Sequence, residues 1–155
     1  MGKRIYTDLI LKHLKAIIAL VVIVGAAGLF VGFGPPGLYA KSSTPEFCAA
    51  CHVMESNYEN WFHNGGHRRN QCVDCHLPND NPVNYGFWKS VDGMKDVWMF
   101  YSGRVPERIR LSEHGASVVV ENCRRCHEQM VSFIKEDRQC WECHRRLSHL
   151  TTGAM

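Results

Sequence analysis

Residues 41–155 of this chain lack any excess of basic over acidic side chains, since they carry 14 of each. The formal charge of +3 therefore belongs to residues 1–40, which hold four basic residues and one acidic residue. A protein that binds nucleic acid concentrates its positive charge on its folded part. We therefore expect no nucleic acid among the partners of this chain.

Charge is also missing between Lys15 and Lys41, where residues 16–33 are apolar or glycine throughout. Such a stretch spans about 27 Å as a helix, close to the thickness of a bilayer core, and Pro35-Pro36 stops the helix. The alternative is a cleaved signal peptide, but its apolar region is usually about 7–15 residues, and the residues before Lys41 make a poor cleavage site. We predict a cytoplasmic arm at 1–15, a transmembrane helix at 16–38 and an outer domain at 39–155.

The basic residues before this apolar span set its expected orientation, because positive charge keeps the adjoining segment in the cytoplasm. Few basic residues follow the span directly. The sequence therefore predicts a single-pass protein of the cytoplasmic (inner) membrane, with the lipid bilayer as one partner. The outer domain is expected in the periplasm of a Gram-negative cell.

All eight cysteines belong to four copies of C-x-x-C-H, which is the attachment signature of c-type haem. Two thiols at this spacing can bond both vinyl groups of one porphyrin, while the adjacent histidine lies against the iron. The copies are Cys48/Cys51/His52, Cys72/Cys75/His76, Cys123/Cys126/His127 and Cys140/Cys143/His144. We predict four covalently bound haem c groups.

Paired cysteines have three other common uses in proteins. Disulfides suit the outer side of a membrane, but random pairing would not put histidine after every second cysteine. A redox C-x-x-C pair normally occurs once, within a βαβ pattern that is absent here. Zinc is the serious competitor, because the spacing from Cys51 to Cys72 approaches that of a zinc ribbon, yet a ribbon needs no histidine after each pair.

Four haems in the residues after the span leave about 29 residues each, too few for an ordinary apolar core. We predict an all-α fold with much irregular loop, in which one transmembrane helix precedes a compact tetrahaem domain whose core is the haems. Arginine pairs near the motifs are candidate partners of the haem propionates, with ordinary solvated arginines as the alternative. They are Arg68, Arg69, Arg124, Arg125, Arg145 and Arg146.

Four six-coordinate haems need eight axial ligands, and the motif histidines offer four. His67 lies five residues before Cys72 and His149 five residues after His144, close enough for both to serve as distal ligands. Met54 follows in C-x-x-C-H-x-M, where a thioether is a plausible ligand that raises the potential. His63 and His114 are weaker candidates, and a core methionine or surface histidines are the alternatives.

The insert at 83–103 separates the motifs into two pairs and is rich in aromatic residues. Lys89, Asp92 and Asp96 share one helical face. This pattern suits a membrane–water interface and also a quinone pocket, where a carboxylate can accept the protons of quinol oxidation. The alternative is a surface helix with solvated ion pairs.

This set of motifs resembles the NapC/NirT family of membrane-anchored tetrahaem quinol dehydrogenases. The features that carry the resemblance are the N-terminal anchor, the four C-x-x-C-H motifs, Met54 and a histidine shortly after the fourth motif. The short length and the tail CWECHRRLSH are most similar to the small subunits of cytochrome c nitrite reductase complexes.

The resemblance implies roles for particular residues. Met54 would hold the first haem with His52 displaced, and Asp96 would lie over the opposite haem face, beside a quinol site, with Lys89 nearby. His67 and His149 would be the distal ligands of two haems in the second pair, opposite His127 and His144 in an order left open. The second haem, with proximal His76, would take a lysine from the partner, with His63 and His114 as fallback ligands.

The expected function is therefore oxidation of quinol, with menaquinol favoured, and transfer of electrons through four haems to a periplasmic multihaem nitrite reductase subunit, as in nitrite ammonification. One alternative is the same conduit feeding another periplasmic reductase. Others are a small terminal multihaem reductase and a zinc-binding membrane protein.

Overall fold

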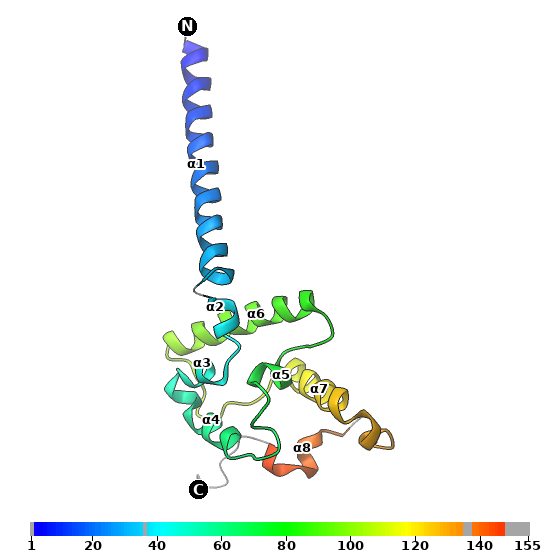
Figure 1. Ribbon diagram of the computed structural model, residues 1–155. Coiled ribbons are helices and arrows are strands. Elements are labelled where there is room, and N and C mark those ends of the chain that lie inside the picture. The colour runs from blue at the N-terminus through cyan, green and yellow to red at the C-terminus, as the bar shows by residue number, and fades with distance from the viewer. Residues whose placement is uncertain (1, 36, 135–137, 148–155) are drawn as a thin grey trace. The chain divides into compact units, whose positions relative to one another are not determined.

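The computed structural model describes residues 2–35, 37–134 and 138–147, and every regular element in these ranges is a helix. The chain divides into two compact units, Met1–Ser42 and Ser43–Met155. Figure 1 shows that the second unit contains two longer helices, α6 and α7, and several short ones, joined by irregular segments. The structure thus agrees with the predicted all-α fold.

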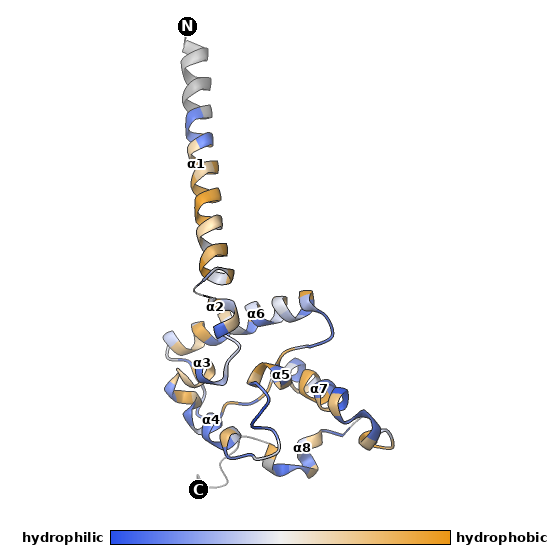
Figure 2. Cartoon of the chain, in the orientation of Figure 1, coloured by the Kyte–Doolittle hydropathy of each residue, from blue (hydrophilic) through white to orange (hydrophobic). Residues whose placement is uncertain are grey.

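The first unit is dominated by α1, Gly2–Phe33. Its segment Lys12–Phe33 is long and apolar enough to cross a membrane, and Figure 2 colours the second half of α1 as largely hydrophobic. The helix ends at Phe33, earlier than the predicted limit of 38. Gly34 donates its N–H to the Phe30 carbonyl at 2.7 Å, and Pro35 cannot continue an α-helix.

The predicted division into an arm and a span has no counterpart in the backbone, because α1 is continuous from Gly2. Gly37 adopts the left-handed conformation with φ 57°, which glycine reaches without steric cost. The short helix α2, Leu38–Lys41, follows it. The exact limits of the membrane-spanning segment stay a prediction.

The second unit places each haem motif on or beside a helix. The elements are α3 (Pro45–Ala49), η1 (His52–Met54), α4 (Glu55–Phe62), α5 (Cys72–His76), α6 (Pro82–Tyr101), α7 (Glu113–Val131), α8 (Cys140–Cys143) and η2 (Arg145–Leu147). The chain leaves helical geometry at His127, with φ −112° and ψ 18°. This kink falls on the histidine of the third motif.

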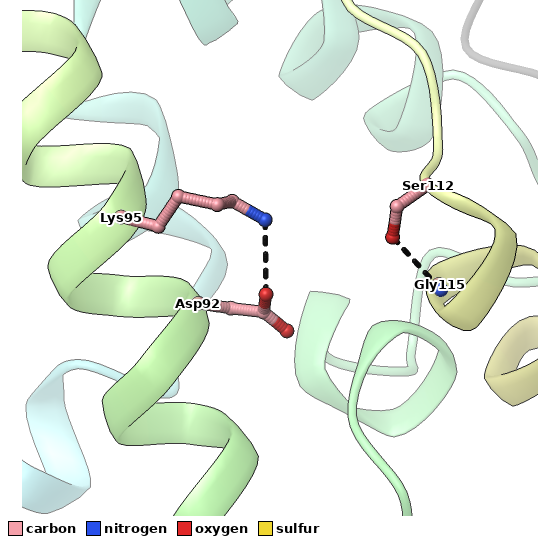
Figure 3. A network of polar contacts seen from close by, with 4 residues as sticks. All are labelled: Asp92, Lys95, Ser112 and Gly115. Carbon is pink, nitrogen blue, oxygen red and sulfur yellow. Dashed lines mark hydrogen bonds and ion pairs between the residues drawn. The ribbon is translucent and has the colours of Figure 1, made fainter.

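The longer helices begin at side-chain caps that the sequence supplies locally. Asn81 accepts the N–H of Asn84 at 2.8 Å at the start of α6. Ser112 accepts the N–H of Gly115 at 3.1 Å at the start of α7, as Figure 3 shows. Such caps satisfy backbone donors that have no partner within the helix.

The interior of the second unit contains few buried side chains. Among the described residues, the buried hydrophobic ones are Val73, Leu77 and Val118, and no large side chain is fully buried. These three lie where α5 and the segment after it pack on α7. A domain of this size needs more buried apolar area than that, in keeping with the prediction that haems supply the core.

Candidate haem centres and quinol site

The first two motifs meet at their leading cysteines. The thiol of Cys72 donates a hydrogen bond to the sulfur of Cys48, which lowers the pKa of the Cys48 thiol and raises that of Cys72. The two residues are far apart in the sequence, so tertiary structure alone brings them together. Motif one therefore lies beside motif two.

The second and third motifs are joined by the packing of α5 on α7, which lie side by side in Figure 1. Burial is the main factor that raises the pKa of the Cys75 thiol, and the nearby sulfur of Cys126 adds to it. The helix α5 is the second motif itself, and the third motif occupies part of α7. Motif two therefore lies beside motif three.

A polar cluster fixes this contact between α5 and α7. Asn122 is 6% exposed and donates to the carbonyl oxygens of Cys75 at 3.0 Å and Leu77 at 2.8 Å. Its own oxygen accepts from Asn79 and from the Arg125 Nε, both at 3.3 Å. A buried polar side chain whose hydrogen bonds are made positions the groups around it.

The third and fourth motifs meet at Cys123 and Cys140. Burial raises the pKa of the Cys123 thiol to about 12, and the charge of Cys140 and a hydrogen bond between the two sulfurs add to the effect. The four motifs thus form a spatial series in sequence order, each beside the next. This agrees with the predicted pairs and adds the contact between them.

His67 lies next to both motifs of the second pair. Its ring centre is 6.1 Å from that of His127, with the ring planes at 63°. Two imidazoles on opposite sides of one metal ion have centres about 6 Å apart, because each metal–nitrogen bond is about 2 Å long. His67 also lines a cavity of about 470 Å³ with Cys143 and His144.

These observations test whether the chain fits haem c. All eight cysteines are free thiols, each pair stands within about one helical turn, and the His67–His127 spacing matches two axial ligands. Within the described ranges no three His, Cys, Asp or Glu side chains converge on one point. The residues therefore fit four haem c groups.

Around the first motif, the ring of His52 packs 5.5 Å from the ring of Phe100 on α6. Met54 is half-buried, and its sulfur accepts a weak hydrogen bond from the Asn57 side chain at 3.7 Å. The predicted ligand Met54 and the motif histidine His52 thus have separate contacts.

The helix α6 brings two predicted quinol-site residues to the same motif. Both Asp96 and Lys89 act electrostatically on the Cys48 thiol, Asp96 raising its pKa and Lys89 lowering it. Lys89 donates to the Ser43 hydroxyl and lies 5.6 Å from the centre of the Tyr85 ring. Motif one, Lys89 and Asp96 therefore form one site.

The charges of this site are tuned by their surroundings. Loss of water around the carboxyl raises the pKa of Asp96, which the charge of Asp92 reinforces and that of Lys95 opposes. Burial lowers the pKa of Lys89. Asp92 pairs with Lys95 at 3.0 Å (Figure 3). A carboxyl whose pKa is raised is better suited to take up a proton at neutral pH.

The remaining candidates are distributed as follows. His63 pairs with Glu59 at 3.4 Å, and the ring of His114 stacks on Trp88 with centres 3.6 Å apart, so both fallback ligands have other contacts. His149 lies outside the described residues. The described structure also places His76 in the second motif, at the end of α5.

Among the arginines near the motifs, Arg125 makes hydrogen bonds within the protein. Its guanidinium donates to the Asp74 carbonyl at 3.3 Å in addition to its bond with Asn122. Arg145 lines the cavity with His67 and His144. Arg68 and Arg69 are exposed. The role of these arginines as propionate partners stays a prediction.

Sequence reasoning missed Asn122, Asn79 and Phe100. Asparagine is common in loops and caps, and nothing local distinguishes a buried bridging asparagine from an exposed one. The position of Asn122 directly before Cys123 was the only available signal.

The fold and these sites define a class, that of membrane-anchored multihaem cytochromes of the c type. The chain belongs to the NapC/NirT cytochrome c family, whose N-terminal region matches residues 11–146. This confirms the predicted family and the four covalent haem c groups.

Two relatives and one solved structure are similar over most of the chain. The cytochrome c-type protein NrfH of Wolinella succinogenes is 36% identical over 148 residues, covering 84% of each chain. The cytochrome c nitrite reductase subunit NrfH of Nitratidesulfovibrio vulgaris is 32% identical over 108 residues, covering 67% of this chain and 66% of that one. A chain of the cytochrome c nitrite reductase NrfHA complex bound to the HQNO inhibitor superposes with a TM-score of 0.66 at 26% identity, covering 86% of this chain and 93% of that one.

Proposed function

We propose that this chain is a quinol dehydrogenase that passes electrons from the membrane to a periplasmic cytochrome c nitrite reductase. The observation that carries the proposal is the series of four haem motifs, the first of which lies beside Lys89 and Asp96. The likeness to NrfH of two organisms and to a chain of the NrfHA complex supports the nitrite reductase as partner.

The reaction oxidises a quinol, with menaquinol favoured, to its quinone and releases two electrons and two protons. When bound, the four haem c groups supply one-electron transfer between the quinol and the reductase. Asp96, whose pKa is raised by loss of water around it, accepts a quinol proton. Lys89, with its hydrogen bond to Ser43, orients the quinol oxygen.

The ligands follow from the same contacts. Each haem would be bonded to the two cysteines of its motif. Met54 would hold the first haem, because His52 packs against Phe100, and Asp96 would lie beside that haem. His76, His127 and His144 would each hold one of the other three.

His67 and His127 would hold the third haem together, because their ring spacing of 6.1 Å fits two imidazole ligands of one iron. His149, outside the described residues, would then hold the fourth haem together with His144. A lysine of the reductase would be the second ligand of the second haem.

In the membrane, we infer a cytoplasmic arm at 1–15, a spanning segment within 16–38 and a periplasmic tetrahaem domain at 39–155. The support is the basic residues Lys3, Arg4, Lys12 and Lys15 before the apolar segment, since positive charge favours the cytoplasmic side.

Anaerobic mixing of the purified, detergent-solubilised protein with a menaquinol analogue tests the function. The haem α-band should appear rapidly, and HQNO should block the reduction. Asp96→Asn and Lys89→Ala should slow reduction at least tenfold with four haems still attached. Asp80→Asn, an exposed carboxylate just before α6, is the matched control and should react at the wild-type rate.

Two outcomes would contradict the proposal. Protein that dithionite reduces but the quinol analogue does not would remove the quinol site from this chain. Fast nitrite reduction by the isolated chain with dithionite would favour a terminal reductase.

A further inference from the structure

The helix α6 has one face turned toward the first motif. Tyr85 and Lys89 contact Ser43, Asp96 acts on Cys48, and Phe100 packs on His52. These α6 residues are spaced by four, seven and four positions, which corresponds to one or two helical turns, so they share one side of the helix. The quinol-site residues all belong to this inner face.

The opposite face of α6 carries an exposed apolar stripe. At 3.6 residues per turn, the stripe lies about 180° around the helix from the inner face. Val83 is 82%, Met94 71% and Tyr101 83% exposed. The outer stripe consists of Val83, Phe87, Val91, Met94, Trp98 and Tyr101.

A continuous stripe of this kind is unusual on a protein surface that faces water, and it marks an interaction site. The haem motifs do not account for it, because the contacts of α6 with the first motif are made by the inner face. We therefore expect the stripe to contact a partner outside the domain.

We propose that the outer stripe of α6 lies in the interface of an anionic lipid bilayer, as a second membrane attachment besides α1. This inference rests on the membrane anchoring of the proposed function. The covalent connection supports it, since the ten residues from Phe33 to Ser43 reach at most about 35 Å. Ser43 in turn bonds to Tyr85 and Lys89 on α6.

The residue types also favour lipid over a protein partner. Trp98 and Tyr101, near the end of the stripe, are the types enriched where membrane meets water. Directly after the helix, Arg104, Arg108 and Arg110 are exposed, and Glu107 is the one acid among residues 104–110. Basic side chains next to an apolar helix face attract anionic headgroups.

This placement would give α6 two roles on opposite sides. Its outer stripe contacts lipid, and its inner face carries Lys89 and Asp96 at the first motif. A quinol leaving the bilayer would then have only the width of one helix, about 10 Å, to cross before it reached Asp96.

Cysteine labelling of the full haem-loaded chain tests the proposal, because haem occupies all eight native thiols. Single cysteines are introduced as Met94→Cys and Tyr101→Cys in the stripe, and as Ser117→Cys at an exposed position of α7 for control. Each variant is placed, one chain per disc, in nanodiscs of phosphatidylethanolamine and phosphatidylglycerol and treated with a charged maleimide. Rates are divided by those of the same variant unfolded in guanidinium.

The stripe cysteines should react at least tenfold more slowly than Ser117→Cys, and a photoactivatable lipid should cross-link to residues 82–101. Equal rates at all three positions would overturn the proposal. Protection that appears only with two chains per disc, or only after the reductase is added, would also overturn it in favour of a protein interface. Haem reduction by menaquinol is measured separately in the same discs. If menaquinol fails to reduce the haems while the stripe cysteines are protected, the proposed function is refuted and the lipid contact of the stripe is not.

Discussion

Replacing Asn122 by leucine should loosen the contact between the second and third haem motifs. Leucine has a similar size but cannot donate to the carbonyl of Cys75, which Asn122 reaches at 3.0 Å. The carbonyl of Leu77 keeps a second donor, because Asn79 also bonds to it at 2.7 Å. Leucine also removes the oxygen that accepts from Asn79 and the Arg125 Nε, but both side chains donate to other carbonyls as well. The main loss is therefore the donor to the buried Cys75 carbonyl, which costs about 1–3 kcal/mol.

Hydrogen exchange of the backbone amides of α5 measures this cost. A loss of about 2 kcal/mol corresponds to exchange roughly 30-fold faster, since each 1.4 kcal/mol is a factor of ten. Ser117→Ala on the same helix α7 is the control, because the bond of its hydroxyl to Glu121, at 3.4 Å, is exposed. Exchange in α5 that changes less than threefold in Asn122→Leu would refute the reasoning.

The same variant should also slow electron transfer between the two haem pairs. A wider separation between motif two and motif three would delay reduction of the second pair after quinol is added, while the first pair is reduced at the normal rate. Stopped-flow spectra taken at two temperatures would separate the two phases.

Three further predictions concern the axial ligands. Met54→Ala should change the spectrum of one haem with all four still attached, whereas an unchanged spectrum would make His52 the ligand. His67→Ala should convert one low-spin haem to high spin, seen by electron paramagnetic resonance, and four unaltered haems would exclude His67. His114→Ala should lose about 1 kcal/mol of stability with its stack on Trp88 but leave every haem spectrum unchanged, and a new high-spin signal would identify His114 as a ligand after all.

Local chemistry explains what could be predicted without a structure. Attachment of haem c needs two cysteines and a histidine within five residues, so the number of haems can be counted from these short motifs. The apolar stretch at 16–33 predicts a spanning helix because membrane insertion depends on local hydropathy. The helix α6 follows from its Asn81 cap, Pro82 and periodic pattern. The stop after Phe33 follows from Pro35 and Pro36.

Residues distant in the sequence explain the rest. The contacts of Cys48 with Cys72, of Asn122 with the carbonyl of Cys75, and of His67 with His127 join positions that no local pattern relates. For the same reason the pattern of histidines in the sequence left the partner of His67 open, and the structure brings its ring centre to 6.1 Å from that of His127.

The sequence by itself determined the composition of this protein, namely one apolar anchor, four haem motifs and an aromatic helix with Lys89 and Asp96 on one face. Covalent attachment, helix propensity and hydropathy act over a few residues, so they can be read along the chain. Only the tertiary structure decided the order of the motifs in space, the buried bridge at Asn122 and the exposure of the outer stripe of α6. These depend on which segments pack together, and packing is a property of the whole folded unit.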